Sequence, residues 1–112
     1  MDKFPCPVEE TLKIIGKEWT LLILRDLYYG KKRFSEFQRS LKGISPKTLS
    51  ERLDELEEHN LVTRKIFAEI PPRVEYTLTE KGLGLKPVVE ALRDYGCNYL
   101  NVKPAVAPHA SR

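Results

Sequence analysis

Basic side chains gather in one short part of this 112-residue chain, between residues 31 and 47. In this stretch six charged residues are basic and one, Glu36, is acidic. The basic residues are Lys31, Lys32, Arg33, Arg39, Lys42 and Lys47. A cluster of ammonium and guanidinium groups neutralises several phosphates of a polyanion and releases their counterions. The chemistry indicated by this basic cluster is therefore contact with a nucleic-acid backbone.

The stretch that follows, SPKTLSERLDELEEHN from residue 45 to residue 60, contains groups that attract phosphate and groups that repel it. It opens with hydroxyl groups and a lysine, and then carries five carboxylates within the eight residues 51–58. In a helix, Leu49 and Leu53 would lie on the buried face, while Lys47 would point outward. A recognition helix reads bases mainly with its N-terminal part, so the later carboxylates would lie where the helix leaves the groove. The pattern predicts a DNA-reading helix.

The side chains expected to contact DNA follow from this geometry. Those expected to face bases are Ser45, Lys47, Thr48, Glu51 and Arg52, and those expected to contact phosphates are Lys31, Lys32, Arg33 and Lys42. Glu51 can accept a hydrogen bond from the amino group of cytosine. Arg73, between two predicted strands, is expected to reach an adjacent minor groove, whose negative potential attracts arginine. A solvated helix also shows charges opposite a leucine stripe, so this alternative stays open for each single contact.

Three helices are predicted before the recognition helix. Pro7 suits the first position of a helix that runs to Ile15. A second helix, from about residue 18 to residue 29, is apolar over most of its circumference and includes Trp19, so we expect it to be buried. A short third helix covers residues 33–41, and a tight turn leads from it to Ser45, whose hydroxyl can cap the next helix.

Two strands and a long helix are predicted after residue 60. Residues 61–67 and 74–78 are rich in β-branched and aromatic residues, and residues 68–73 between them contain two adjacent prolines. This pattern predicts a β-hairpin with a stiff tip, because proline fixes φ. The last helix begins after Thr79, is weakened by two glycines, and continues to Tyr99.

The predicted order is helix, helix, short helix, turn, helix, hairpin and long helix. A short helix joined by a tight turn to a second helix is the helix-turn-helix motif, and a hairpin directly after it makes a winged helix. The predicted fold class is therefore mainly α with a small β-hairpin wing, a winged helix-turn-helix. Winged helices also serve as protein-interaction modules without DNA binding, and this is the alternative function. Such a module would have little use for the basic cluster or for Arg73.

Several short motifs resemble those of HxlR-type winged helix-turn-helix transcriptional regulators, a MarR-like family. They are Cys6-Pro7, GKEWT at 16–20, RFSEF at 33–37, GISPKTL at 43–49, IPPRVEY at 70–76 and LTEKG at 78–82. The motifs stand in the family's order and extend the resemblance from about Cys6 to Gly96. The resemblance implies a prokaryotic DNA-binding protein that is dimeric through its terminal helices and acts as a repressor or an activator.

The resemblance also implies a redox-sensing role for Cys6. Several members of the family sense oxidants or electrophiles through a cysteine ahead of the first helix, and Cys6 occupies that place. The helix dipole there would favour a thiolate. Glu9 and Glu10 follow closely, however, and cysteine is often a buried, inert residue, so a structural role stays open. Cys97 is interpreted as a helix-packing residue.

The apolar stripes of the two terminal helices lead us to expect a homodimer. Val8 and Leu12 lie on the stripe of the first helix, and Leu92 and Tyr95 lie on that of the last. A single small domain cannot easily cover both stripes, whereas a symmetric dimer can. A two-fold axis would place the two recognition helices about 34 Å apart, one turn of DNA, or a multiple of it. The expected partner is double-stranded DNA with a pseudo-palindromic operator.

Other classes of protein are not indicated. His59 and His109 form no metal-binding or Cys–His catalytic pattern, and the chain has no glycine-rich phosphate loop. We therefore expect no enzyme activity, no metal and no cofactor; an inducer, small molecule or oxidant, is left undetermined. The sequence shows neither a signal peptide nor the roughly 20 apolar residues of a membrane helix, so a cytoplasmic location without membrane contact is expected. Residues 6–100 are expected to form one domain, followed by a flexible tail at 101–112.

Overall fold

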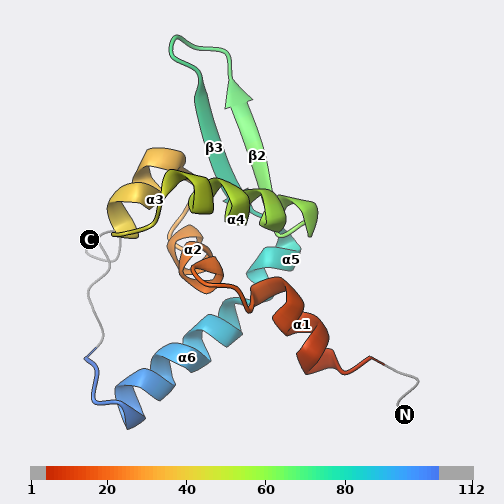
Figure 1. The fold of residues 1–112 in the computed structure, drawn as a ribbon, viewed down its shortest axis with the longest axis vertical. Coiled ribbons are helices and arrows are strands. Elements are labelled where there is room, and N and C mark those ends of the chain that lie inside the picture. The colour runs from red at the N-terminus through yellow and green to blue at the C-terminus, as the bar shows by residue number, and fades with distance from the viewer. Residues whose placement is uncertain (1–4, 104–112) are drawn as a thin grey trace.

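The computed structural model describes residues 5–103 and is mainly helical, with one three-stranded sheet (Figure 1). Its elements are α1 (Pro7–Ile15), α2 (Thr20–Leu27), β1 (Lys32–Arg33), α3 (Phe34–Ser40), α4 (Pro46–Glu58), β2 (Val62–Phe67), β3 (Arg73–Leu78), α5 (Glu80–Leu83) and α6 (Lys86–Tyr99). The strands lie in the order β1-β3-β2, and both pairings are antiparallel. The predicted helix-turn-helix with a hairpin wing is confirmed. Most of the predicted tail, residues 104–112, lies outside the described range.

The strand β1 differs from the prediction, which begins the third helix at residue 33. Its two residues, Lys32 and Arg33, pair with Tyr76 and Glu75 of β3. A strand this short depends on a partner far along the chain, so no local pattern in the sequence indicates it. The pairing ties the segment before α3 to the wing.

The predicted last helix is divided into α5 and α6. Thr79 caps α5, because its Oγ1 accepts a hydrogen bond from the backbone N–H of Gly82 at 3.0 Å. A Cβ atom at Gly82 would collide with the backbone carbonyl of Leu61, so this close approach requires glycine. The chain then turns, and α6 begins at Lys86 with a proline in its first turn. The division changes the direction of the chain, and α6 leaves the core.

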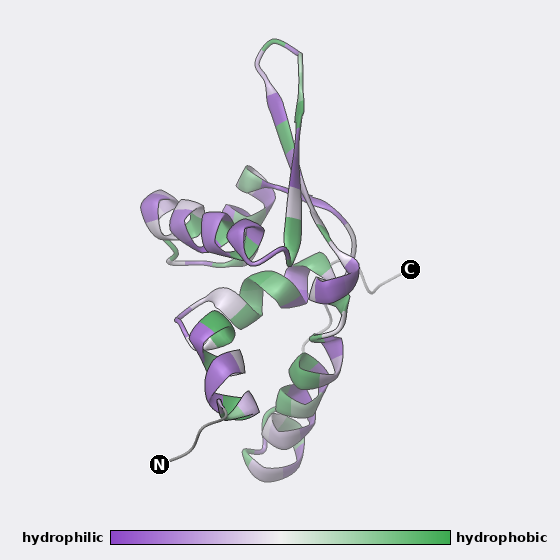
Figure 2. Ribbon diagram, turned by 90° about the vertical axis from the view of Figure 1, so that its right-hand side faces the viewer, coloured by the Kyte–Doolittle hydropathy of each residue, from purple (hydrophilic) through white to green (hydrophobic). Residues whose placement is uncertain are grey.

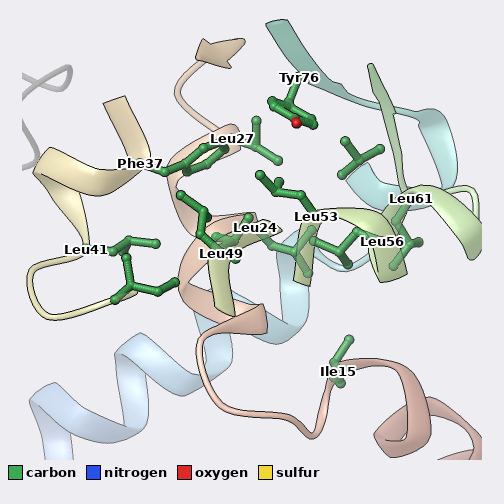
Figure 3. Packing of buried hydrophobic residues seen from close by; sticks show 13 residues of the cluster. Ile15, Leu24, Leu27, Phe37, Leu41, Leu49, Leu53, Leu56, Leu61 and Tyr76 are labelled. Atoms are coloured by element: carbon green, nitrogen blue, oxygen red, sulfur yellow. The ribbon is translucent and has the colours of Figure 1, made fainter. Parts of the chain in front are cut away.

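The core lies between α2, α3, α4 and the sheet (Figure 3). Leu49, Leu53 and Leu56 of α4 are at most 1% exposed, as their spacing predicts. Phe37 of α3 and Tyr76 of β3 meet edge to face, with ring centroids 6.1 Å apart. Apolar packing therefore fixes which face of α4 is buried and leaves the opposite face to solvent.

The helix α2 begins at Thr20, later than predicted. Trp19 precedes it with φ 80°, in the left-handed region, and its partly buried side chain packs against the core. A bulky residue adopts this conformation only where its surroundings hold it there. Residues 16–19 thus form a fixed corner between the first two helices, which we call the α1–α2 corner.

The wing of β2 and β3 projects from one side of the core, whereas α1 and α6 extend on the other side (Figure 1). Neither helix is well covered, because α1 buries only Ile15 and α6 buries none of its residues. Hydrophobic residues recur along α6 in Figure 2. Within residues 5–103 the structure contains no helix with the length and apolar character needed to cross a bilayer.

Candidate nucleic-acid interface

The helix-turn-helix consists of α3, the turn of residues 41–45, and α4. Gly43 in the turn has φ 95°, which glycine adopts without strain. Ser45 caps α4 as predicted, because its Oγ accepts a hydrogen bond from the backbone N–H of Thr48 at 3.0 Å. The hydroxyl groups of these two residues also lie 2.9 Å apart, within hydrogen-bonding distance. The turn and the cap together determine where α4 begins.

The beginning of α4 presents polar side chains to solvent. Ser45, Lys47 and Glu51 are exposed, and Thr48 is partly exposed. Lys47 has no polar partner in the part of the chain that the structure describes. The carboxylate of Glu51 lies 4.0 Å from the guanidinium of Arg52. Four of the five residues predicted to face bases are therefore accessible in this arrangement.

Arg52, the fifth, is oriented differently from the prediction. Its Nε–H donates a hydrogen bond to the backbone carbonyl of Glu18 at 3.0 Å. Its guanidinium also lies 3.4 Å from the carboxylate of Glu55, and its side chain is only 17% exposed. Arg52 thus points at the α1–α2 corner, and a base contact would require it to leave these partners.

Most of the basic cluster lies at the surface beside the helix-turn-helix. Lys31, Arg33, Arg39 and Lys42 are exposed. The single acid of the cluster, Glu36, accepts a hydrogen bond from the backbone N–H of Arg33 at 2.7 Å. Its carboxylate therefore caps α3, and the surface that the cluster presents is predominantly positive.

Lys32, which was also predicted to contact phosphate, is the exception, because the structure buries it. The residue is 4% exposed, and its Nζ donates to the backbone carbonyl of Gly30 at 3.3 Å. Adjacent residues of a strand point to opposite faces, so Lys32 in β1 points inward where Arg33 points outward. A contact with phosphate would require the ammonium group of Lys32 to leave this buried position.

Arg73 lies at the base of the wing tip, as the first residue of β3. Its guanidinium lies 3.0 Å from Glu69 and 3.5 Å from Glu75, and its Cζ lies 3.9 Å from the centre of the Phe67 ring. The side chain is 26% exposed. Two carboxylates and an aromatic ring thus hold Arg73 within the hairpin, and residues 68–72 form the tip beyond it.

Cys6 lies immediately before a helix, as the sequence predicts. It is exposed and stands immediately before α1, where its carbonyl oxygen accepts a hydrogen bond from the backbone N–H of Glu10 at 2.9 Å. Cys97 in α6 is partly buried, and both thiols are free. Within residues 5–103 no group of three or more side chains is suited to bind a metal ion. The reactivity of Cys6 stays a prediction.

An apolar groove lies along α1, where the first turn of α6 approaches it. Its lining residues are Pro7, Val8, Thr11, Leu12, Ile15 and Val88. Of the lining residues, Val8 is 66% exposed and Leu12 53%; further along α6, Leu92 is 53% exposed and Tyr95 56%. Exposed apolar side chains gathered on two helices are typical of an interaction site. These are the two stripes that the sequence predicts for dimerisation.

Comparison with known proteins agrees with this geometry. A family described as HxlR-like helix-turn-helix matches residues 14–104. The uncharacterized HTH-type transcriptional regulator YdeP of Bacillus subtilis is 44% identical over 94 residues, which cover 84% of this chain and 73% of YdeP. The crystal structure of the HTH-type transcriptional regulator YtcD has a TM-score of 0.82 at 39% identity and covers 88% of this chain and 100% of that one. The redox regulator HypR in its oxidized form has a TM-score of 0.79 at 38% identity, covering 89% and 100%.

Proposed function

The chain belongs to the HxlR-like helix-turn-helix family, and we propose that it regulates transcription by placing the first turn of α4 in the major groove of an operator. Its relatives are HTH-type transcriptional regulators, which favours DNA binding over the alternative of a protein-interaction module. The observation that carries the proposal is the beginning of α4. It is exposed, contains no acid in its first turn, and lies beside the basic cluster.

Base reading is assigned to the exposed polar groups of this first turn and the next. The proposed set is Ser45, Lys47, Thr48 and Glu51, with Arg52 included only if it exchanges its protein partners for DNA. Lysine donates to the O6 and N7 atoms of guanine, and a carboxylate accepts from the amino group of cytosine. Lys31, Arg33 and Lys42 are proposed to contact phosphates, which fix the register of the protein on the duplex.

The test is the difference in affinity between two duplexes at several salt concentrations. One duplex is the sequence that the protein enriches from a random library, and the other is a shuffled version of it. We expect tighter binding to the enriched duplex, and log K should fall with log salt by about 0.9 per phosphate contact. Equal affinity for both duplexes, or affinity that does not depend on salt, would contradict the proposal.

Lys47→Ala is the sharpest single variant for this test. Loss of a lysine that reads a base should weaken binding to the enriched duplex by about 1–3 kcal/mol and affect the shuffled duplex much less. Lys81→Ala in α5 removes the same charge from an exposed residue outside the helix-turn-helix and serves as the control. An equal loss on both duplexes would assign Lys47 to phosphate.

We further propose that a second copy of the chain covers the groove between α1 and α6. The exposed apolar side chains of the two helices support this, since symmetric dimers are the commonest oligomers. The dimer would present two copies of α4 to half-sites about 34 Å apart, or a multiple of that distance. The operator should then be a pseudo-palindrome.

Redox sensing is proposed for Cys6, whose exposed thiol stands before α1. HypR, similar in structure to this chain, is described as a redox regulator, and its oxidized and reduced forms are both known. No catalytic role is proposed, because the family consists of transcriptional regulators. We infer a cytoplasmic location from the proposed DNA partner, because the operator DNA of a prokaryote lies in the cytoplasm.

A further inference from the structure

Two side chains of α4 fasten it to the α1–α2 corner. Arg52 donates from Nε to the backbone carbonyl of Glu18 at 3.0 Å, and its Nη1 lies 3.4 Å from Oε1 of Glu55. The second oxygen of Glu55 accepts from Nζ of Lys17 at 2.8 Å. One arginine and one carboxylate of α4 thus hold two consecutive residues of the corner. We call Lys17, Glu18, Arg52 and Glu55 the α4 clamp.

The clamp lies on a defined flank of α4. Residues 48, 52 and 55 follow at helical spacing, so Arg52 and Glu55 share the flank of Thr48. The corner of the protein occupies this flank beyond the first turn, whereas Lys47 and Glu51 project from the face that stays open. The corner therefore blocks one flank of α4 to an approaching duplex and leaves the face of Lys47 and Glu51 open.

The α1–α2 corner also contains a residue in a strained backbone conformation. The carbonyl that Arg52 contacts belongs to the peptide group joining Glu18 to Trp19, and Trp19 has φ 80°. A bulky residue in the left-handed region persists only where its surroundings over-determine it. The hydrogen bond from Arg52 is one such restraint, so a shift of α4 against the corner would break a charge-assisted bond.

The partial burial of the clamp makes it more than a surface ion pair. The side chain of Arg52 is 17% exposed and that of Glu55 is 32% exposed, while Lys17 at the outer end is 53% exposed. Water competes less for the two inner groups, so their mutual contact and the contact with the carbonyl are stronger than those of an exposed pair. The contacts of Arg52 and Glu55 therefore restrain α4 more strongly than the contact of Lys17 does.

We propose that Arg52 and Glu55 are positioning residues that determine the angle at which α4 enters DNA and link it to α1. This inference rests on the proposed DNA-binding function. α1 supplies five of the six residues that line the apolar groove proposed to bind a second copy, and the clamp joins the corner that follows α1 to the recognition helix. In the proposed dimer, the α1–α2 corner would therefore help to set the distance between the two recognition helices.

The direction in which one substitution changes DNA affinity distinguishes a positioning role from a simple effect of charge. Glu55→Ala removes a negative charge from the helix nearest the phosphates, so charge alone would tighten binding to any duplex. Loss of positioning predicts weaker binding to the enriched duplex. Glu58→Ala removes the same charge from an exposed residue of the same helix, whose side chain has no described contact, and it is the matched control.

The experiment compares these variants on the enriched and shuffled duplexes, with circular dichroism to confirm folding. We expect Glu55→Ala to weaken binding to the enriched duplex about two- to tenfold, the range of a typical net hydrogen-bond contribution, and to leave the shuffled duplex unchanged or tighter. Glu55→Gln keeps an oxygen acceptor for Arg52 and should recover part of the loss. Glu58→Ala should weaken neither complex.

Arg52→Lys gives an independent measurement, because lysine keeps the charge but cannot reproduce the planar guanidinium contacts. It should match Glu55→Ala, and the double variant should lose little more than either, since both break the same contact. Glu55→Ala behaving like Glu58→Ala would overturn the inference. The inference would also be overturned if the effect of Arg52→Lys on affinity depended on the identity of a single base pair, because Arg52 would then be a base reader. If the unmodified protein enriches no duplex, the DNA-binding proposal itself fails.

Discussion

At the scale of single residues, charge and spacing in the sequence predict a DNA-facing surface, but they do not predict which of its side chains are held by partners within the protein. Lys32, Arg52 and Arg73 were all expected to reach DNA, and each is directed at an acceptor within the protein. Those acceptors are the carbonyl of Gly30, the carbonyl of Glu18 and the carboxylates beside Arg73. The partner of Arg52 lies 34 positions away, whereas those of Lys32 and Arg73 are near in sequence and come into reach only when the strands pair.

Arg73→Ala tests whether the wing contributes to binding. Removal of this cation should weaken the enriched and shuffled duplexes about equally and make the salt dependence shallower by about 0.9. It should also lower the free energy of unfolding by about 1 kcal/mol or more, because the nearly buried carboxylate of Glu75 keeps only Lys31, at 3.5 Å, as an ion-pair partner.

Lys65→Ala on the neighbouring strand is the control for this prediction, since it removes the same charge while Glu75 keeps its ion pairs with Arg73 and Lys31. Lys65→Ala should make the salt dependence of DNA binding shallower but should leave the midpoint of urea unfolding unchanged. If Arg73→Ala binds DNA normally at low salt, the hairpin only supports the fold.

Cys6→Ser tests the proposed sensor. Mild oxidant or a quinone should change the affinity of the unmodified protein for the enriched duplex, because the exposed thiol of Cys6 is accessible to these reagents. The serine variant should bind with the same affinity before and after treatment, while Cys97→Ser should still respond. An identical response of Cys6→Ser and the unmodified protein would remove Cys6 from the mechanism.

At the scale of elements, the sequence predicts what local physics determines. The Ser45 cap and the leucine stripe specify α4, and β-branched residues specify β2 and β3, because each signal lies within a few residues. The strand β1 depends on pairing with β3, and the α4 clamp joins residues 38 positions apart, Lys17 and Glu55. Neither has a local signal, which is why the positioning role of Glu55 was not predicted.

The junction of α2 with α5 makes a prediction about pH. The hydroxyl of Tyr28 donates to the carbonyl of Gly82 at 3.0 Å, and burial, followed by the charge of Glu90, raises the pKa of Tyr28 to about 12. Between pH of about 10 and 12 the folded protein keeps this proton while the unfolded chain loses it, so stability falls as pH rises.

Tyr28→Phe should show a smaller fall in the free energy of unfolding across this range, measured by urea titration at several pH values. Below pH of about 9 the variant should be less stable by the value of one hydrogen bond, about 1 kcal/mol. Parallel pH profiles for the two proteins would contradict the role assigned to Tyr28.

At the scale of the whole molecule, the prediction concerns assembly. Analytical ultracentrifugation near micromolar concentration should give about twice the chain mass of 12.9 kDa. Leu92→Asp places a charge on the exposed apolar face of α6, so it should weaken both dimerisation and binding to the enriched duplex. Leu92→Met keeps the apolar surface and should retain both. A monomer that binds a palindromic duplex tightly would contradict the dimer proposal.

The uncovered helix α6 has a consequence for the amount of protein in a cell. An isolated helix of its length is marginal in water, and none of its 14 residues is buried. In dilute protein its amide hydrogens should exchange rapidly, and exchange should slow as concentration rises and a second copy covers the helix. Unassembled chains would therefore offer proteases an accessible segment that assembled chains conceal. Turnover would then remove surplus chains first and keep the regulator close to the concentration at which it pairs.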